Sequence, residues 1–323
     1  MRTTTGRPTR ALFLLGVSAF ALGALPAAAQ SPQGGTVASG AARISQTARQ
    51  STIRQTSERA VIDWKSFDVG RTHRVVFDQP GKSSATLNRV NSVSKSVIQG
   101  SITAPGTVII QNTAGVLFSK GAKLDVGGLV ATSQTVDAAR FQQGGGLSIG
   151  GGERPGARVV NEGEVTIGEK GLAALVGGNV ENAGAIYART GTVALASGTR
   201  TTIDLSGDGA IQIAVGGNPA EGGVVNSGLI DAGAGRVLLT AGDAASAIDS
   251  VINTTGVIRA GSSSGSGGRI ELIGRGSGKV RIGGTVSASG ATGGGSVAIT
   301  GESVAVDGAA KPACVAETLV VVA

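Results

Sequence analysis

Very few residues in this chain could perform catalysis or bind a metal ion. Among 323 residues there is one histidine, His73, so any Ser-His-Asp triad or multi-histidine metal site would depend on that side chain alone. His73 lies between Arg71 and Arg74, just before the apolar run Val75-Val76-Phe77, and we interpret it as a histidine at the edge of a strand. Asp204 and Asp208 could offer two carboxylates to Ca²⁺, well short of the roughly 6 to 8 oxygens that the ion takes. We therefore predict no metal site.

Two glycine-rich segments do not match the nucleotide-binding loops that they superficially resemble. The segment 274–279 contains the Gly-Lys of a phosphate-binding loop. However, Ile273 precedes it where such a loop has its first glycine, and Val280 follows it where such a loop has Ser or Thr. The segment 141–157 contains two glycine triplets but lacks the G-x-G-x-x-G register between a strand and a helix, so we expect a loop there. A polysaccharide-cleaving site built from Asp, Lys and Arg is an alternative, but no cluster of these residues can be nominated. We predict that the protein is not an enzyme and uses no cofactor.

The charge and cysteine content exclude further classes. The formal net charge is +7, and it falls to +4 without the three arginines of residues 1–29. The basic residues are scattered and lack interleaved aromatic side chains, so we predict no nucleic-acid partner. Cys314 is the single cysteine and cannot form an internal disulfide. We interpret it as an incidental free thiol, with pairing to another molecule as the alternative.

The first residues indicate export. Three arginines precede an apolar run from Ala11 to Leu25, which is followed by Pro26 and the small residues 27–29. This pattern is typical of a signal peptide cut after Ala29, and the apolar run is shorter than the roughly 20 residues of a membrane span. We predict a mature protein that crosses the inner membrane and is secreted or held at the cell surface.

The composition favours many short strands over an ordinary globular core. The chain has 55 glycines but only six Phe, one Trp and one Tyr, and glycine at this density disfavours helices. Its hydrophobic content of 41% is too high for a simple disordered chain. Short strands joined by turns satisfy both conditions.

An Asn-x-Gly motif recurs along the second half of the chain. Its asparagines are Asn161, Asn182 and Asn226, spaced 21 and then 44 residues apart, with a looser copy beginning at Asn253. Because 44 is twice 22, we expect one solenoid coil for about every 22 residues, hence about 13 coils. We expect the glycine and asparagine to accept the positive φ of tight corners, and the stacked asparagines to form a ladder.

A second recurring element has apolar residues two apart, which is the periodicity of a strand. Its copies begin at glycines 191, 235, 268, 278 and 295. One such coil cannot bury its apolar face alone, but stacked coils can, so the sequence predicts a parallel β-helix. A β-sandwich is the alternative. An exposed solenoid end needs a cover, and Ile44 and Ile53 suggest a hairpin over the first coil, with a short helix as the other interpretation.

The region from Gly40 to about Asp137 resembles a known family. The residues that carry the resemblance are Ile62-Asp63-Trp64-Lys65-Ser66-Phe67, Leu87-Asn88-Arg89-Val90, Val108-Ile109-Ile110-Gln111-Asn112-Thr113-Ala114-Gly115-Val116 and Val126-Gly127-Gly128-Leu129-Val130-Ala131-Thr132-Ser133. They are similar to the amino-terminal secretion domain of two-partner-secretion exoproteins, the filamentous haemagglutinin family. The resemblance implies a capped, right-handed parallel β-helix that the periplasmic domains of a dedicated outer-membrane transporter recognise.

The same resemblance nominates site residues. Trp64 and Phe67 match the motif before the first regular coils, and Asn88-Arg89 match a turn that leads into a strand. The family's Asn-Pro-Asn-Gly-Ile turn aligns with residues 112–116, where Asn112 and Gly115 match while Thr113 and Ala114 depart. For Asn112 and Gly115 a corner role and a contact role stay open, and for Trp64 a core role is preferred.

These observations give one functional prediction with two alternatives. We predict an all-β, secreted, two-partner-secretion exoprotein that attaches to a surface receptor on a host or neighbouring cell. Its predicted parts are a signal peptide (1–29), a secretion domain (30–140), a glycine-rich loop (141–157), further coils (158–308) and an atypical tail (309–323). The alternatives are a small secreted binding protein for haem or carbohydrate, and a truncated adhesin remnant.

Overall fold

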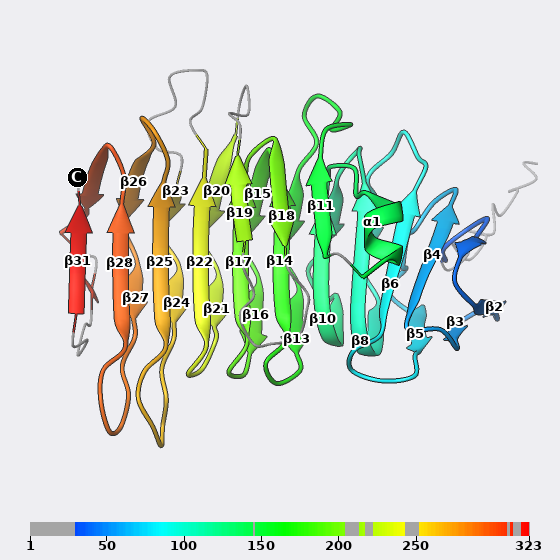
Figure 1. The fold of residues 1–323 in the computed structure, drawn as a ribbon, viewed down its shortest axis with the longest axis horizontal. Coiled ribbons are helices and arrows are strands. Elements are labelled where there is room, and N and C mark those ends of the chain that lie inside the picture. The colour runs from blue at the N-terminus through cyan, green and yellow to red at the C-terminus, as the bar shows by residue number, and fades with distance from the viewer. Residues whose placement is uncertain are drawn as a thin grey trace, which may run out of the picture.

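The computed structural model describes residues 30–144, 146–203, 213–216, 222–242, 252–308, 311–312 and 318–322. The predicted signal peptide, Asp204, Asp208 and Cys314 lie outside the described residues. Within them the chain winds into coils stacked along one axis, and each strand pairs in parallel with the equivalent strand of the next coil (Figure 1). This arrangement is a parallel β-helix, right-handed as parallel crossover connections are. The predicted fold class is confirmed.

Three stacks of strands form the walls of the solenoid. Stack 1 contains β4 (Arg59–Trp64), β6 (Ala85–Val90), the second halves of β8 (Ser101–Asn112) and β10 (Lys123–Thr132), β14 (Leu172–Gly177), β17 (Thr192–Ser197), β22 (Arg236–Ala241), β25 (Arg269–Gly274), β28 (Ser296–Thr300) and β31 (Thr318–Val322). Stack 2 contains β3 (Gln50–Gln55), β5 (Arg74–Asp78), the first halves of β8 and β10, β13 (Glu164–Ile167), β16 (Ala185–Ala188), β21 (Leu229–Asp231), β24 (Val257–Arg259), β27 (Thr285–Ser287) and β30 (Lys311–Pro312). Stack 3 contains β7 (Ser96–Ile98), β9 (Val116–Phe118), β12 (Val159–Asn161), β15 (Asn179–Asn182), β20 (Gly223–Asn226), β23 (Ile252–Thr254), β26 (Lys279–Ile282) and β29 (Ser303–Val306).

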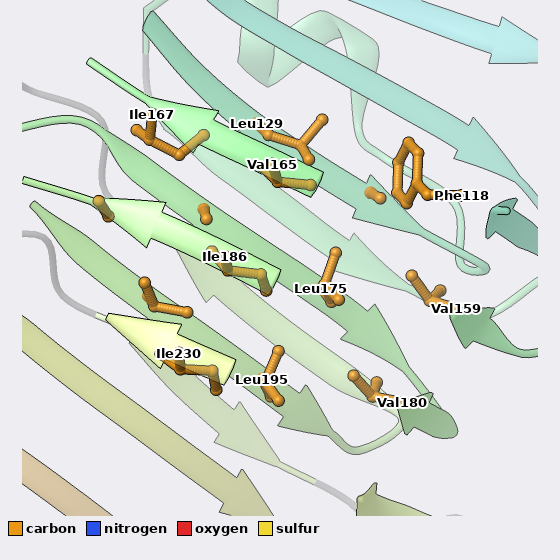
Figure 2. Packing of buried hydrophobic residues seen from close by; sticks show 14 of the residues in the cluster. Phe118, Leu129, Val159, Val165, Ile167, Leu175, Val180, Ile186, Leu195 and Ile230 are labelled. Carbon is orange, nitrogen blue, oxygen red and sulfur yellow. The ribbon is translucent and has the colours of Figure 1, made fainter. Parts of the chain in front are cut away.

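The interior is filled by aliphatic side chains contributed by all three stacks. Figure 2 shows Leu175 and Leu195 of stack 1, Ile186 and Ile230 of stack 2, and Val180 of stack 3 pointing into the same interior. The inward side chains of successive coils lie above one another, because the parallel register pairs Ile186 with Ile230. The inward-pointing residues of each strand therefore contact apolar side chains at the equivalent positions of the next coil. Together they exclude water from the interior.

The expectation of about 13 coils is wrong. Stack 1 has ten strands among the described residues, and Asn182 pairs directly with Asn226, so the 44-residue interval is one coil and not two. The interval is long because it holds β18 (Arg200–Ile203) and β19 (Ile213–Gly216), which lie outside the three stacks. Spacing alone could not distinguish a second coil from an insertion.

The predicted asparagine ladder is present. The amide of Asn161 donates to Asn182 Oδ1 at 2.8 Å, and that of Asn182 donates to Asn226 Oδ1 at 2.8 Å. Asn226 then donates to Thr254 Oγ1 at 3.3 Å, so Thr254 and not Asn253 continues the ladder. All four side chains are completely buried. Each amide thus satisfies its neighbour in a site that water does not reach.

The glycines at these corners have a different purpose from the one expected. A Cβ on Gly228 would lie 2.1 Å from the carbonyl oxygen of Gly184, and one on Gly256 would lie 2.2 Å from that of Gly228. Gly184, Gly228 and Gly256 all lack a positive φ. Glycine is needed here because adjacent coils approach too closely for a side chain, and the positive-φ explanation is wrong at these positions.

One of the repeated strand elements belongs to another wall. The elements beginning at glycines 191, 235, 268 and 295 become β17, β22, β25 and β28 of stack 1. The element after Gly278 is β26, which pairs with β23 and β29 in stack 3. The alternation of apolar residues identified the strand but did not show which stack it belongs to.

The N-terminal end carries the expected cover. β2 (Ala42–Gln46) pairs antiparallel with β3, with Ile44 opposite Ile53, and β1 (Thr36–Ser39) pairs antiparallel with β4. The hairpin interpretation is confirmed and the helical one is wrong. The two antiparallel pairings cap the first coil and occupy its exposed edge.

The segment 141–157, expected to be a loop, takes part in an outer layer. Helix α1 (Ala138–Gln142) extends into it, and β11 (Leu147–Gly150) forms an antiparallel sheet with β18 and β19. These elements lie against the outer face of stack 1, seen at the front of Figure 1. The described residues contain no helix with the length and apolar character that a membrane span requires.

Candidate functional site

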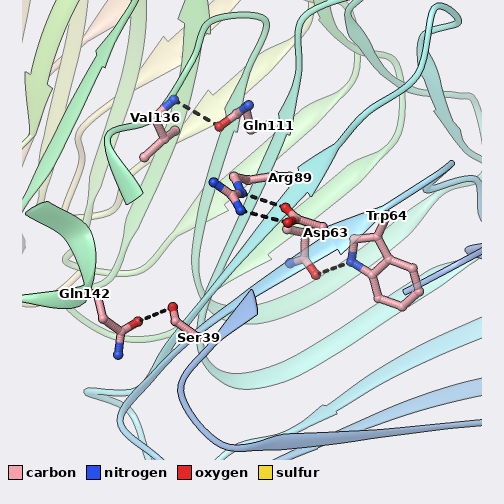
Figure 3. Close-up of polar contacts among 8 residues, drawn as sticks. Ser39, Asp63, Trp64, Arg89, Gln111, Val136 and Gln142 are labelled. Carbon is pink, nitrogen blue, oxygen red and sulfur yellow. Dashed lines mark hydrogen bonds and ion pairs between the residues drawn. The ribbon is translucent and has the colours of Figure 1, made fainter. Parts of the chain in front are cut away.

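Trp64 and Asn88 join the first two coils inside the solenoid. The indole Nε1 of Trp64, at the end of β4, donates to Asn88 Oδ1 in β6 at 3.0 Å (Figure 3). Phe67 packs edge-on against the indole, with ring centroids 5.4 Å apart. All three side chains are buried. The expected core role of Trp64 fits this geometry, and the indole N–H has the partner that a buried donor needs.

Asn88 also reaches the third coil. Its Nδ2 donates to the carbonyl oxygen of Ile109 in β8 at 3.1 Å, while its Oδ1 accepts from Trp64. The side chain therefore connects β4, β6 and β8 through one buried amide. An apolar residue of the same size would leave the indole donor unpaired.

Arg89 lies on the opposite face of the same strand, and since both residues are inside β6 the expected turn at Asn88 and Arg89 is wrong. Its guanidinium contacts Asp63 in β4 through two hydrogen bonds, Nε to Oδ1 at 2.7 Å and the terminal nitrogen to Oδ2 at 2.8 Å (Figure 3). The side chain of Arg89 is 31% exposed and that of Asp63 is 32% exposed. This bidentate ion pair is the part of the nominated motif that solvent and a partner can reach.

Asn112 and Gly115 build the corner between β8 and β9. The Oδ1 of Asn112 accepts from the Ala114 amide at 2.9 Å, and its Nδ2 donates to Ser96 Oγ at 3.0 Å. Gly115 has a φ of +110°, and a Cβ there would lie 2.7 Å from the carbonyl oxygen of Arg158. Both the backbone conformation and the next coil require glycine. Thr113 and Ala114, which depart from the family's turn, are half-buried and lie at the solvent side of the corner.

The nominated residues form one connected region with one reachable charge. The register places Trp64 opposite Val90 and Val90 opposite Asn112, so Trp64 and Asn112 occupy the same position two coils apart. Trp64, Phe67, Asn88, Asn112 and Gly115 are buried, and Arg89 alone of the six is half-exposed. Most of the motif therefore maintains the shape of the first coils.

Sequence reasoning missed several partners of these residues. Asp63 stands inside the quoted motif, yet nothing in its spacing indicated that it pairs with Arg89 one coil away. Gln111 is 6% exposed and accepts from the Val136 amide at 3.0 Å (Figure 3). Glu153 accepts the Gly178 amide at 2.9 Å from within the supposed loop. These contacts depend on which strands become neighbours, and local patterns do not record that.

The residues considered for catalysis do not assemble a reactive centre. His73 directly precedes β5 and is buried, and its Nε2 contacts Ser51 Oγ at 2.9 Å while Nδ1 has no hydrogen-bond partner. A Ser-His pair needs an orienting carboxylate and access for substrate, and neither is found here among the described residues. The described ranges also contain no group of three or more His, Cys, Asp or Glu that could hold a metal ion.

The segment compared with a phosphate loop is a turn between two strands. β25 ends at Gly274 and β26 begins at Lys279, so no helix follows whose N-terminus could bind a phosphate. A shallow pocket of about 500 Å³ lies on the outside of stack 2, where β8 bends away from the end of β5. Asp78, Asp125 and Pro105 are among its lining residues. Its lining contains carboxylates and threonines but no histidine, lysine or cysteine.

Comparisons with known proteins place this fold in a family. A family model described as the TPS secretion domain matches residues 28–282. The crystal structure of the HMW1 secretion domain from Haemophilus influenzae is similar with a TM-score of 0.73 and 26% identity, over 87% of this chain and 73% of that chain.

Two curated proteins of Haemophilus influenzae are similar in sequence, and both are named heme/hemopexin-binding protein. One is 38% identical over 212 residues, which are 62% of this chain and 23% of that protein. The other is 44% identical over 91 residues, which are 28% of this chain and 10% of that protein. This chain thus aligns with less than a quarter of the length of either relative. Since the family model spans most of the chain, the chain belongs to the family of TPS secretion domains, the secretion domains of haemagglutinin-like exoproteins.

Proposed function

We propose that the first coils direct this chain to a two-partner-secretion transporter in the outer membrane, whose periplasmic domains recognise them. The observation that carries the proposal is the family match over residues 28–282, together with the similarity to the HMW1 secretion domain. The protein is on this view exported and not catalytic. The transporter would recognise the surface of the folded first coils.

The burial of the nominated residues divides the motif into two roles. Trp64, Phe67, Asn88, Asn112 and Gly115 would act by holding the first coils in shape, because their side chains or backbone are covered. Arg89, paired with Asp63, would act by contact, because about a third of each side chain is exposed. The half-buried Thr113 and Ala114 border the same region at the next corner.

The first experiment is secretion of the full chain from a Gram-negative host with and without the transporter encoded beside it. We expect the protein in the medium only when the transporter is present. Equal amounts in the medium in both cases, or retention in the periplasm in both, would contradict the proposal. Mass spectrometry of the secreted protein would test the proposed cleavage after Ala29.

A second Arg–Asp ion pair, more exposed than the first, supplies a control for the contact role. Arg89→Ala removes the pair with Asp63, and Arg54→Ala removes the pair with Asp78, which joins the next strands of the same end at 3.3 Å. We expect Arg89→Ala to lower secretion about tenfold, the effect of roughly 1.4 kcal/mol of lost contact energy. Arg54→Ala should secrete normally. Equal effects of the two would show that surface charge in general, and not Arg89, is recognised.

Surface attachment is the downstream task that we propose for the exported chain. A solenoid displays its outward side chains in rows along flat walls, which suits a receptor on a host or neighbouring cell. Binding of the purified chain to intact cells, competed by excess unlabelled protein, would test it. Binding that does not saturate would contradict a specific receptor.

Haem binding is a second candidate, favoured by the names of the two curated relatives. The described residues offer few iron ligands, since His73 is buried and Tyr187 is 36% exposed on stack 2. Titration of the purified chain with haemin, followed by the Soret band, tests this candidate. If haem binds through the tyrosine, Tyr187→Phe should abolish the shift; an unchanged spectrum of the wild-type protein on titration would exclude the candidate.

A further inference from the structure

The outer face of stack 1 carries a second hydrophobic core, separate from the solenoid interior. Leu87, Ile109 and Val130, on adjacent strands β6, β8 and β10, point outward and are nevertheless completely buried. They pack in one cluster with Phe141 of α1, Leu147 and Ile149 of β11, and Ile203 of β18. The burial of three early coils thus depends on residues that come much later in the sequence.

The cover over this core is a strap, residues 146–157, which contains β11 and Glu153. β11 pairs antiparallel with β18, with Leu147 opposite Ile203 and Gly150 opposite Arg200. On its other edge β11 bonds to residues 135–137, with Val136 opposite Ile149. Without β18 the edge of β11 that faces Ile203 would be unpaired, and a two-stranded pairing alone is only marginally stable in water. The strap therefore needs residues 200–203 in place.

Glu153 fastens the other end of the strap. Both of its carboxylate oxygens accept from the Gly178 amide, at 2.9 and 3.0 Å, and it also accepts from the Ser133 hydroxyl. Gln134 Nε2 bridges Glu153 Oε2 at 3.3 Å and the Gly198 carbonyl oxygen at 2.6 Å. A Cβ on Gly178 would lie 2.8 Å from Glu153 Oε2, so a side chain at this position would displace the carboxylate from its bonds. These hydrogen bonds of Glu153 and Gln134 also join the strap to residues near 198.

The cover also reaches back to the N-terminal cap through α1. Ser39 in β1 donates to Gln142 Oε1 at 3.0 Å, and the guanidinium of Arg59 in β4 lies 5.4 Å from the centre of the Phe141 ring (Figure 3 for the first contact). The half-buried Arg59 and the fully buried Phe141 hold the helix against the first coil. One continuous set of contacts thus runs from residue 39 to residue 203.

We propose that the strap is a lock, which closes over the first coils only when residues 198–203 are in place. Before that point the cap and the inner core can form, but Leu87, Ile109 and Val130 stay open to water and the first coils unfold readily. One consequence rests on the proposed export: the secretion domain reaches full stability only after about the first 200 residues have crossed the membrane.

Hydrogen exchange of the purified full chain tests the lock without any transporter, so its outcome is independent of the proposed function. Ile203→Ser weakens the strap from β18, and Thr202→Ser is the matched control on the half-exposed face of the same strand. We expect Ile203→Ser to speed amide exchange at least tenfold in residues 107–111 and 128–132, about 70 to 100 positions earlier in the chain. Thr202→Ser should leave these amides as in the wild type.

A second variant keeps the test decisive if Ile203→Ser does not fold. Glu153→Gln keeps the size of the side chain but removes the charge that the Gly178 amide and the Ser133 hydroxyl donate to. We expect faster exchange in the same two segments, by a smaller factor. Faster exchange confined to β11, β18 and β19, with residues 107–111 unchanged, would overturn the proposal.

Discussion

The first coils and the later coils of this solenoid are held together by different means. The buried aromatic side chains Trp64, Phe67, Phe77, Phe118 and Phe141 all precede residue 142, whereas residues 142–323 contain one aromatic residue, the partly exposed Tyr187. Polar contacts differ in the same way. The first coils use individual bonds such as Trp64 to Asn88, and the later coils use one asparagine position repeated from coil to coil.

The difference follows from position in the stack. A middle coil has an equivalent coil on each side, so one residue type at one position can satisfy itself along the whole row. The first coil has such a neighbour on one side only, and on the other side it must end the solenoid against an antiparallel cap. Large, specific side chains fill that irregular space. The N-terminal end therefore carries distinctive residues, and a partner can distinguish it from the repetitive body.

The largest effect that we predict is that of removing the central aromatic of the first coils. Trp64→Ala should lower the free energy of unfolding by about 3 to 5 kcal/mol, because it leaves a cavity and an unpaired Asn88 oxygen. Tyr187→Ala, at the exposed aromatic of the later coils, should change it by less than about 0.5 kcal/mol. Denaturation in urea followed by circular dichroism measures both. Equal effects would contradict the view that aromatics are structural only at the N-terminal end.

A break in the ladder should come next in size and should stay local. Asn182→Ala removes the side chain that bonds both the Asn161 amide and the Asn226 oxygen. Each buried group left unpaired should lower the free energy of unfolding by about 1 to 3 kcal/mol. Exchange should quicken in β12, β15 and β20 and stay unchanged in β4 and β6, because each coil contacts only its neighbours. Asn91→Ala, at an exposed asparagine, is the control. A rise spread evenly over all coils would contradict one-dimensional coupling in the body.

The sequence predicted the features that repeat and those that a motif marks. Glycine-rich, aromatic-poor composition and the recurring Asn-x-Gly gave the β-helix, and opposed Ile44 and Ile53 gave the cap hairpin. The buried ladder from Asn161 to Asn226 was predicted because stacked equivalents must meet when coils pair in register. These features follow from local chemistry repeated at a nearly fixed spacing.

What the sequence did not predict depends on contacts between segments far apart. The interval from Asn182 to Asn226 was interpreted as two coils, because an insertion and a coil of equal length look alike. The segment 141–157 was interpreted as a loop, because glycines 150–152 hide a four-residue strand whose partner is 50 residues away. At the candidate site, the motif gave Arg89 but not its partner Asp63, since that pair is set by strand register.

Steric tightness at the later corners can be tested by adding one methyl group. Gly228→Ala would place a Cβ 2.1 Å from the Gly184 carbonyl oxygen, and we expect a loss of about 1 to 3 kcal/mol from the forced separation of two coils. Gly81→Ala, in a loop of the first coils, meets nothing within 4 Å and should be neutral or slightly stabilising. Thermal denaturation compares the two. A neutral Gly228→Ala would show that the coil spacing is adjustable and that the glycine row has another cause.

The smallest effect concerns the two surface ion pairs of the first coils. A double-mutant cycle on Asp63 and Arg89 should give a coupling near 1 kcal/mol, because the pair is bidentate and half-buried. The cycle on Arg54 and Asp78 should give about 0.3 kcal/mol, because both side chains are more than half exposed and water screens their single contact. Added salt should weaken the second coupling more than the first. A coupling of Asp63 with Arg89 above about 3 kcal/mol would make the pair a structural element, and a secretion defect of Arg89→Ala would then report misfolding and not lost recognition.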